Sequence, residues 1–516
     1  MLKDFFIKRI SFTISKCRCK TFDVSLHVIK INKLELKEHL RRNIKLALPV
    51  MITQMGQISV NIIDNIMVGG LGGKYDNIED EVLGKTSLAA ASLGNSLFFA
   101  ILVFAFGFSF ALSPLIAAED SKGDKKMAGA YFSHSLVLNV TLSVCLFLLI
   151  TFLKPLMFYM GQPADVVEKC IPYLTIMTFS MIPLMIFQTF RQLSEGLSLT
   201  IPVTIATVLS NVVNIVLNYG WVYGNWGFPR LEVAGAAWGT FVARLVMMIF
   251  LLIVLLNFKK TKSVLKEASF KVADFKKIIF KRIASIGIPT ALTSFFEMSA
   301  FSLAAFVCGY TFTNSIADQE LAKINLAAHQ IAINLASTTF MMCTGIGVAA
   351  TVRIGNQLGL KDYKTLREAG WSCIMMVLTF MIICGVLFIM FRYQLPTIYL
   401  DNQDVINLSA QLLIIASLFQ MSDGIQLVLL GALRGMMDVK IPSILTFVSY
   451  WLIAIPIGVT LAIIFEMRAF GMWIGLGVGL TASAVFLIIR YNRQTNKLIR
   501  DNPNVKINLE DKLKNI

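Results

Sequence analysis

Charged side chains are scarce in this sequence. They make up 15% of its 516 residues, whereas a soluble globular protein carries about 25%. Hydrophobic residues make up 56%, and apolar stretches of about 20 residues or more, each long enough to cross a hydrocarbon core as a helix, recur along nearly the whole chain. The shortage of charge excludes an ordinary soluble protein and predicts a polytopic helical membrane protein.

Histidine and cysteine are rare as well, with four and eight residues. His134 and His329 are the histidines inside predicted spans, which gives little support to the histidine-based metal centre of an integral-membrane enzyme. Cys17 and Cys19 precede the first span, where reducing conditions are expected, and a lone Cys-x-Cys is weak evidence for metal binding. We therefore predict neither enzymatic activity nor a cofactor.

The apolar segments predict an all-α fold with twelve transmembrane helices. The predicted spans are residues 46–70, 87–117, 128–153, 170–190, 201–224, 233–257, 283–311, 325–352, 369–391, 405–431, 441–465 and 469–489. The residues before them lack a long apolar core followed by a small-residue cleavage site, so no signal peptide is expected.

Basic residues concentrate in alternate loops. The formal net charge of +16 would by itself suit a nucleic-acid partner, but nine Lys and Arg lie in residues 258–282 alone. Positively charged loops stay in the cytoplasm. The charge therefore reports topology: it predicts that both termini and this linker are cytoplasmic, and that there is no nucleic-acid partner.

The two halves of the chain resemble each other at an offset of about 240 residues. Pro49 aligns with Pro289, and Gln57 aligns with Glu297. This repeat predicts two six-helix lobes related by a pseudo-two-fold axis, a design common among transporters. The predicted divisions are a cytoplasmic tail (1–43), an N-terminal lobe (44–257), a basic cytoplasmic linker (258–282), a C-terminal lobe (283–491) and a second cytoplasmic tail (492–516).

Three carboxylates stand alone inside long apolar segments: Asp64, Glu297 and Asp423. An ionised side chain at bilayer depth costs at least about 2.5–3.5 kcal/mol. We expect a chain that keeps three of them to bind a positive particle there, whether a proton, a metal cation or a cationic solute.

Other polar residues share helix faces with these acids. The faces are Gln54, Gln57, Asn61 and Asp64 in span 1; Thr207, Asn211, Asn214 and Asn218 in span 5; Thr290, Ser294 and Glu297 in span 7; His329, Gln330 and Asn334 in span 8; and Ser417, Gln420 and Asp423 in span 10. Oxygen ligands suit small hard cations, and protons compete for such buried sites. The stripes also suit simple helix–helix adhesion, in which one hydrogen bond averages about 0.6 kcal/mol. Arg244 and Arg434 are candidate counter-ions.

An ordered set of motifs resembles the multidrug and toxic compound extrusion (MATE) family. The motifs are Pro49, Gln57, Asp64 and Val68-Gly69; Asn214 with Leu217-Asn218-Tyr219; Asn325-Leu-Ala-Ala-His329-Gln330; Val352-Arg353-Ile354-Gly355-Asn356; and Leu433-Arg434-Gly435 with Asp438. The similarity covers about residues 40–490, and the presence of both Glu297 and Asp423 is most similar to the bacterial NorM-type branch.

The resemblance implies a cation-coupled antiporter of a cell inner membrane, monomeric, that exports amphipathic and often cationic drugs and toxic compounds. It implies a cation site, with Na⁺ preferred over H⁺, at Glu297, Asp423, Phe419 and Gln330. It implies a proton- or substrate-coupling centre at Asp64, Gln57, Asn61, Asn214 and Asn218. Asn218 stands where some relatives carry aspartate, and Phe419 where sodium-coupled relatives often carry tyrosine.

Two alternatives stay open at this stage. A flippase for lipid-linked saccharides would share the two-lobe plan, but its cavity should be basic to hold pyrophosphate, whereas the buried charge here is mainly acidic. A proton-coupled exporter of metabolites would use the same carboxylates with another ion and substrate.

Overall fold

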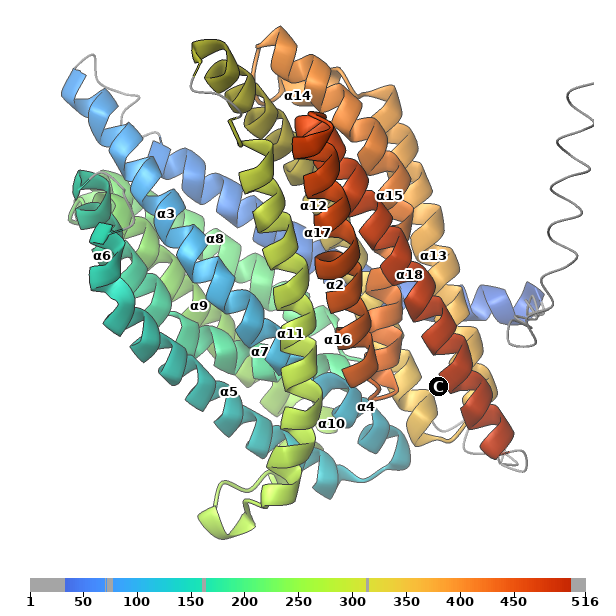
Figure 1. Ribbon diagram of the computed structural model, residues 1–516. Helices are drawn as coiled ribbons and strands as arrows, with labels where there is room; N and C mark the ends of the chain where they lie inside the picture. Colours follow the sequence, from blue (N-terminus) through green and yellow to red (C-terminus); the bar gives the residue numbers. More distant parts are fainter. Residues whose placement is uncertain (1–32, 70, 72–77, 160–163, 312–314, 503–516) are drawn as a thin grey trace, which may run out of the picture.

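The computed structural model describes residues 33–69, 71, 78–159, 164–311 and 315–502 (Figure 1). These residues are helical and contain no strand, which confirms the all-α prediction. The first half contains α2 (Lys33–Gly69), α3 (Ile78–Ser109), α4 (Leu112–Lys122), α5 (Lys125–Leu153), η2 (Lys154–Tyr159), α6 (Ala164–Phe179), α7 (Met181–Gly196), α8 (Ile201–Tyr223), η3 (Asn225–Gly227), α9 (Glu232–Asn257) and α10 (Lys259–Glu267). The second half contains η4 (Val272–Asp274), α11 (Lys277–Cys308), α12 (Ile316–Gly359), α13 (Tyr363–Met390), α14 (Gln394–Thr397), α15 (Gln403–Gly435), α16 (Lys440–Phe447), η5 (Val448–Ala454), α17 (Ile455–Val459), η6 (Thr460–Ile464) and α18 (Arg468–Asp501).

Each predicted span corresponds to a helix or to a helix with a local break. Among the described residues, eleven helical segments are long and apolar enough to cross a bilayer. The remaining predicted span is α2, which carries the Gln54–Asp64 polar stripe. The second span breaks between α3 and α4, and the fourth breaks at Ser180 between α6 and α7. The eleventh span passes through π-helical turns on both sides of α17, whose second residue is Pro456. Proline lacks the amide hydrogen that a regular helix requires.

Buried apolar residues form separate clusters in the two halves. One cluster is built from α2 to α10 and includes Ile116 and Phe187. Another is built from α11 to α18 and includes Leu412 and Trp473. This is the two-lobe arrangement expected from the repeat, while the precise divisions between lobes, linker and tails stay predictions. Residues 1–32, with Cys17 and Cys19, and residues 503–516 lie outside the described part of the chain.

The halves meet at the end of the bundle that carries the basic loops. A shared cluster joins Phe108 and Leu115 to Ile283 and Ile286 of α11. A methyl group at Gly107 of α3 would lie 2.6 Å from a backbone atom of Ala291, so the two backbones approach as closely as glycine permits. In Figure 1, α3 and α11 converge in the lower part of the view and diverge toward its top.

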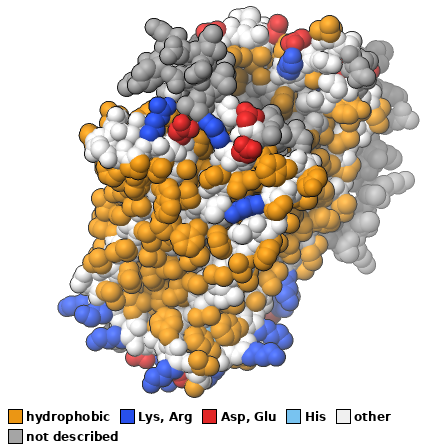
Figure 2. All heavy atoms as spheres, turned by 90° about the vertical axis from the view of Figure 1, so that its left-hand side faces the viewer, with side chains coloured by type: hydrophobic (Ala, Val, Ile, Leu, Met, Phe, Trp, Pro, Cys, Tyr) orange, Lys and Arg blue, Asp and Glu red, His pale blue; other side chains and the backbone are white. Residues whose placement is uncertain are grey.

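The molecular surface matches a membrane protein. Figure 2 shows a broad belt of apolar side chains across one face of the bundle, with Lys and Arg gathered along its lower rim. Large apolar side chains such as Phe152, Ile253 and Phe306 are exposed on the membrane-length helices. Such a surface is stable only when lipid covers it.

Candidate cation-binding and coupling sites

Glu297 lies in a closed hydrogen-bonded group in the second half. Gln426 of α15 donates from Nε2 to Glu297 Oε1 at 3.0 Å, and the Tyr450 hydroxyl of η5 donates to the same oxygen at 3.1 Å. The Gln426 amide also donates to the Tyr450 oxygen at 2.9 Å. Three helical elements thus position one carboxylate oxygen, and both donors are fully buried.

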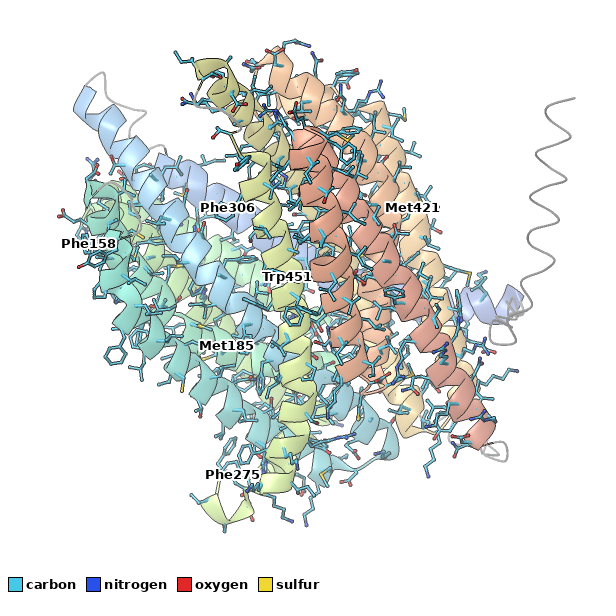
Figure 3. The ribbon with its side chains drawn as sticks, viewed as in Figure 1. Phe158, Met185, Phe275, Phe306, Met421 and Trp451 are labelled. Carbon is cyan, nitrogen blue, oxygen red and sulfur yellow. The ribbon has the colours of Figure 1, made fainter. Side chains whose placement is uncertain are left out.

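The π-helical turn that supplies Tyr450 is fixed to α11 beside the glutamate. Trp451, labelled in Figure 3, donates from its indole nitrogen to the carbonyl oxygen of Phe296 at 3.3 Å. A π turn widens the helix locally and changes the direction in which successive side chains point. Trp451 therefore binds the backbone of one turn of α11, and the neighbouring Tyr450 binds the Glu297 side chain of the same turn.

Asp423 lies one turn before Gln426 on α15 and interacts electrostatically with Glu297. It is 8% exposed, and its Oδ1 atom is buried without a hydrogen-bond partner. The side-chain oxygens of Gln420 and Gln426 are also buried and unpartnered. The Gln420 amide nitrogen is buried and unpartnered as well. Since buried polar atoms are nearly always paired, the free Asp423 oxygen and the two amide oxygens on the same helix form a set of acceptors suited to a hard cation.

No counter-charge compensates the two acids. Within the described residues, neither Glu297 nor Asp423 forms an ion pair with lysine or arginine, and neither has a cation among its electrostatic partners. The described part of the chain also contains no cluster of three metal-binding His, Cys, Asp or Glu side chains. A cation here would be held by two carboxylates and amide oxygens.

Aromatic side chains enclose the neighbourhood of this site. Phe419 is 5% exposed, and its ring lies 5.5 Å from the ring of fully buried Trp473. The Trp473 indole donates to His329 Nδ1 at 3.0 Å, so His329 has a structural partner and packs between α12 and α18. The exclusion of water strengthens every electrostatic interaction near the acids.

Gln330 is not joined to the acids. Its side chain is exposed on α12 and donates to Asn334, also exposed, at 3.2 Å. Polar side chains in the middle of a membrane-length helix require water or polar partners. The structure therefore places Gln330 on a polar face of α12, apart from the hydrogen bonds of Glu297.

Asp64 lies in a second polar group in the first half. Asn218 of α8 donates to Asp64 Oδ1 at 2.6 Å, and Thr240 of α9 donates to Oδ2 at 3.5 Å. Asn214 donates to the Thr240 hydroxyl at 3.2 Å. A methyl group at Gly239 would lie 1.9 Å from the Asn218 side-chain oxygen, so this glycine leaves the space that the asparagine fills.

Arg244 gives the first half a partly buried positive charge. It follows Thr240 by one turn of α9, donates to the Ser180 hydroxyl and lies 5.0 Å from the centre of the Phe98 ring. Arg244 and Asp64 interact electrostatically. The acid of the first half therefore has a cation among its electrostatic partners, whereas the described residues give the acid pair of the second half none.

The remaining members of the predicted coupling centre are less directly placed. Gln57 is half-buried on α2. The Asn61 side chain lies outside the described residues. Of the residues predicted around Asp64, the structure therefore joins Asn214 and Asn218 to it.

Sequence reasoning missed several residues of both groups. Gln426 follows Asp423 by three residues and so lies on the same helix face, a signal that could have been used. Thr240 and Tyr450 sit in spans whose other polar residues form no stripe. Their role follows from contacts between helices distant in sequence.

The fold and the two groups define a class of protein: a two-lobed helical membrane transporter with hydrogen-bonded carboxylates inside the helices of each lobe. The chain belongs to the MatE family, whose model matches residues 80–220 and 284–460. The resemblance noted from the sequence motifs is thereby confirmed, and family membership places the chain among transporters rather than enzymes.

Similar proteins are bacterial drug-resistance proteins. Multidrug resistance protein NorM of Photobacterium profundum is 32% identical over 455 residues, which cover 87% of this chain and 94% of that protein. Multidrug resistance protein MdtK of Yersinia pseudotuberculosis is 28% identical over 455 residues, with the same coverage of 87% and 94%.

Solved structures share the fold. The eukaryotic MATE transporter AtDTX14 has a TM-score of 0.78 at 20% identity and covers 90% of this chain and 99% of its own. A transporter of the MOP superfamily from Pyrococcus furiosus has a TM-score of 0.76 at 20% identity, covering 91% and 99%. At this level of identity the likeness concerns the fold.

Proposed function

We propose that this protein is a cation-coupled antiporter that exports amphipathic, often cationic, drugs and toxic compounds. Its similarity to proteins named for multidrug resistance supports the substrate class. The coupling ion that we propose is Na⁺ in preference to H⁺, because the free acceptors near Glu297 and Asp423 are carboxylate and amide oxygens. We place the protein in a cell inner membrane as a monomer with both termini cytoplasmic.

The uncompensated pair of Glu297 and Asp423 is the observation on which this proposal depends. Two carboxylates held near each other within the helices repel one another, and an arriving cation removes that repulsion. Two conformations that differ in the distance between the two carboxylates therefore differ in free energy by an amount that changes when the cation binds or leaves. A buried acid pair with no such role would destabilise the protein without compensation.

The contacts between the halves suggest how access alternates. In the proposed orientation the halves are in contact at the cytoplasmic end, where a methyl group at Gly359 of α12 would lie 2.3 Å from the carbonyl oxygen of Ala118 of α4. Polar residues of α12 such as Gln330 and Asn334 stay exposed nearer its other end. This arrangement fits an outward-facing state, and export requires that the cytoplasmic contacts open and that the outer ends approach each other.

The driving force is sufficient for export. One inward charge gains about 2.3 kcal/mol per 100 mV, and a tenfold gradient adds about 1.4 kcal/mol. Together they support roughly 500-fold accumulation of a neutral solute. A monovalent cationic drug exchanged one for one moves no net charge and is driven by the chemical gradient alone.

Everted vesicles that load a fluorescent cationic dye test the proposal. Sodium and proton gradients are imposed separately on wild type, Glu297→Gln, Asp423→Asn and Asp64→Asn, with the exposed residue change Glu320→Gln as control. We expect the two C-terminal-lobe variants to lose sodium-driven transport while Glu320→Gln keeps it. Wild-type rates in Glu297→Gln and Asp423→Asn would refute the assignment, and transport driven only by protons would refute the preference for sodium.

A further inference from the structure

The segment between the two halves is held against the first half by a few buried contacts. Thr261 and Val264 of α10 are buried, and His134 of α5 accepts a hydrogen bond from the Lys276 backbone nitrogen at 2.9 Å. The Phe275 ring lies 4.9 Å from that histidine. Figure 3 shows Phe275 at the lower end of the bundle, at the level where the membrane-length helices end.

The outward side of this segment is strongly basic. Lys260 pairs with Asp120 of α4 at 2.8 Å. The other lysines of the segment are exposed, and the structure gives them no ion pair within the described residues. These lysines are Lys259, Lys262, Lys266, Lys271, Lys276, Lys277 and Lys281. The segment holds only two acidic residues, Glu267 and Asp274, and the Ser269 hydroxyl donates to Asp274 at 2.5 Å.

Large apolar side chains project outward among these lysines. Val272 is 88% exposed, Ile278 74%, Phe270 54% and Phe258 44%. The rule that positively charged loops stay in the cytoplasm explains the lysines, but it does not explain why aliphatic and aromatic side chains are exposed beside them. Alternating lysines and large apolar residues at the edge of a bilayer are typical of segments that lie in the lipid interface.

We propose that residues 258–282 form a binding surface for acidic phospholipids. The exposed lysines bind the headgroup phosphates, and Phe270, Val272 and Ile278 enter the boundary between headgroups and acyl chains. Charge complementarity selects anionic over zwitterionic lipid, because each lysine near the surface adds attraction to a negatively charged leaflet. The exposed apolar groups favour a membrane over a soluble polyanion, since a soluble polyanion offers them no apolar environment.

A fluorescent probe at position 272 tests this surface in the full-length protein. The background replaces Cys17, Cys19 and the exposed Cys145 by serine, while the other described cysteines are buried. Val272→Cys is then labelled with an environment-sensitive fluorophore and placed in nanodiscs of phosphatidylcholine with or without phosphatidylglycerol. Gln319→Cys, an exposed position at the start of α12, is the matched control.

The expected result is a blue-shifted emission and at least about twofold quenching by spin-labelled lipid when phosphatidylglycerol is present, with little change at position 319. High salt and the combined change Lys262→Gln, Lys266→Gln, Lys271→Gln and Lys276→Gln should each remove most of the effect. Equal emission in the two lipids would overturn the proposal, as would full quenching in the lysine variant. If the quenching at position 272 did not depend on the lipid and a soluble polyanion abolished it, the surface would bind that polyanion, and the proposal would be wrong.

Discussion

Arg353 of α12 donates a hydrogen bond to the side-chain oxygen of Asn43 of α2 at 2.5 Å, joining the two halves of the molecule. The guanidinium also donates to the His39 backbone oxygen at 3.1 Å and to His39 Nδ1 at 2.9 Å. Asn43 in turn donates to the Ser372 hydroxyl of α13 at 2.9 Å. The start of α2 is therefore held by the second half through a buried polar network.

Replacing Asn43 by alanine should weaken this end of the bundle. The change leaves a buried guanidinium without its closest acceptor, which costs about 1–3 kcal/mol. We expect a lower thermal unfolding temperature and faster modification of cysteines introduced between α2 and α12. The exposed residue change Arg41→Ala on the same helix is the control, and equal stability of both variants would contradict the prediction.

His39 should make the stability of this contact depend on pH. Burial and the neighbouring Arg353 lower the pKa of His39 from 6.5 to about 4. Because Arg353 can only donate, Nδ1 accepts and the ring is neutral, with Nε2 3.7 Å from Glu368 of α13. Arg42, Glu38 and Asp362 are the other charges that act on the ring.

The unfolded chain binds more protons than the folded protein between about pH 4 and 6.5, so stability falls as pH falls through this window. We expect wild type to lose about 2 kcal/mol more than His39→Gln between pH 7 and 5. Thermal unfolding of both proteins at a series of pH values provides the measurement. Parallel curves would show that this histidine does not control the contact.

Removing the Tyr450 hydroxyl should separate ion binding from drug binding. Tyr450→Phe keeps the buried ring but takes away one donor to Glu297 and the acceptor for Gln426. We expect about a 10- to 100-fold change in the concentration of the coupling cation that gives half-maximal transport, consistent with one hydrogen bond to a charged group. Drug affinity should change little. Tyr399→Phe at an exposed site is the control. An unchanged cation dependence in Tyr450→Phe would contradict the assignment of Glu297 to the cation site.

A single methyl group should disturb the Asp64 group. Gly239→Ala forces Asn218 away from Asp64, because the new carbon would lie 1.9 Å from the asparagine oxygen. Overpacking of this kind costs about 1–3 kcal/mol. Gly477→Ala, where the nearest atom of another residue is at 3.6 Å, is the matched control. We expect loss of stability and transport in the first variant only, measured by unfolding temperature and dye efflux.

Part of the candidate site was predictable from the chain and part was not. Glu297 and Asp423 stood out because each is an isolated acid in an apolar run, and Asn214 and Asn218 because they share a helix face. Gln330 shares the face of Asn334 and is hydrogen-bonded to it, a partner that the periodicity of one helix allowed but did not require. Tyr450 carried no local signal, since only the packing of η5 on α11 brings its hydroxyl to the acid.

The sequence by itself determined the helical spans, the twofold repeat and the isolated acids, because hydropathy and helix periodicity are properties of neighbouring residues. The tertiary structure decided which polar groups meet and at which end the halves are in contact. It also decided that Arg244 acts on the acid of the first half, while the part of the chain that the structure describes supplies no cation to the acids of the second. These features depend on distances between side chains on different helices, many of them more than a hundred residues apart in the chain, and such distances are set by how whole helices pack.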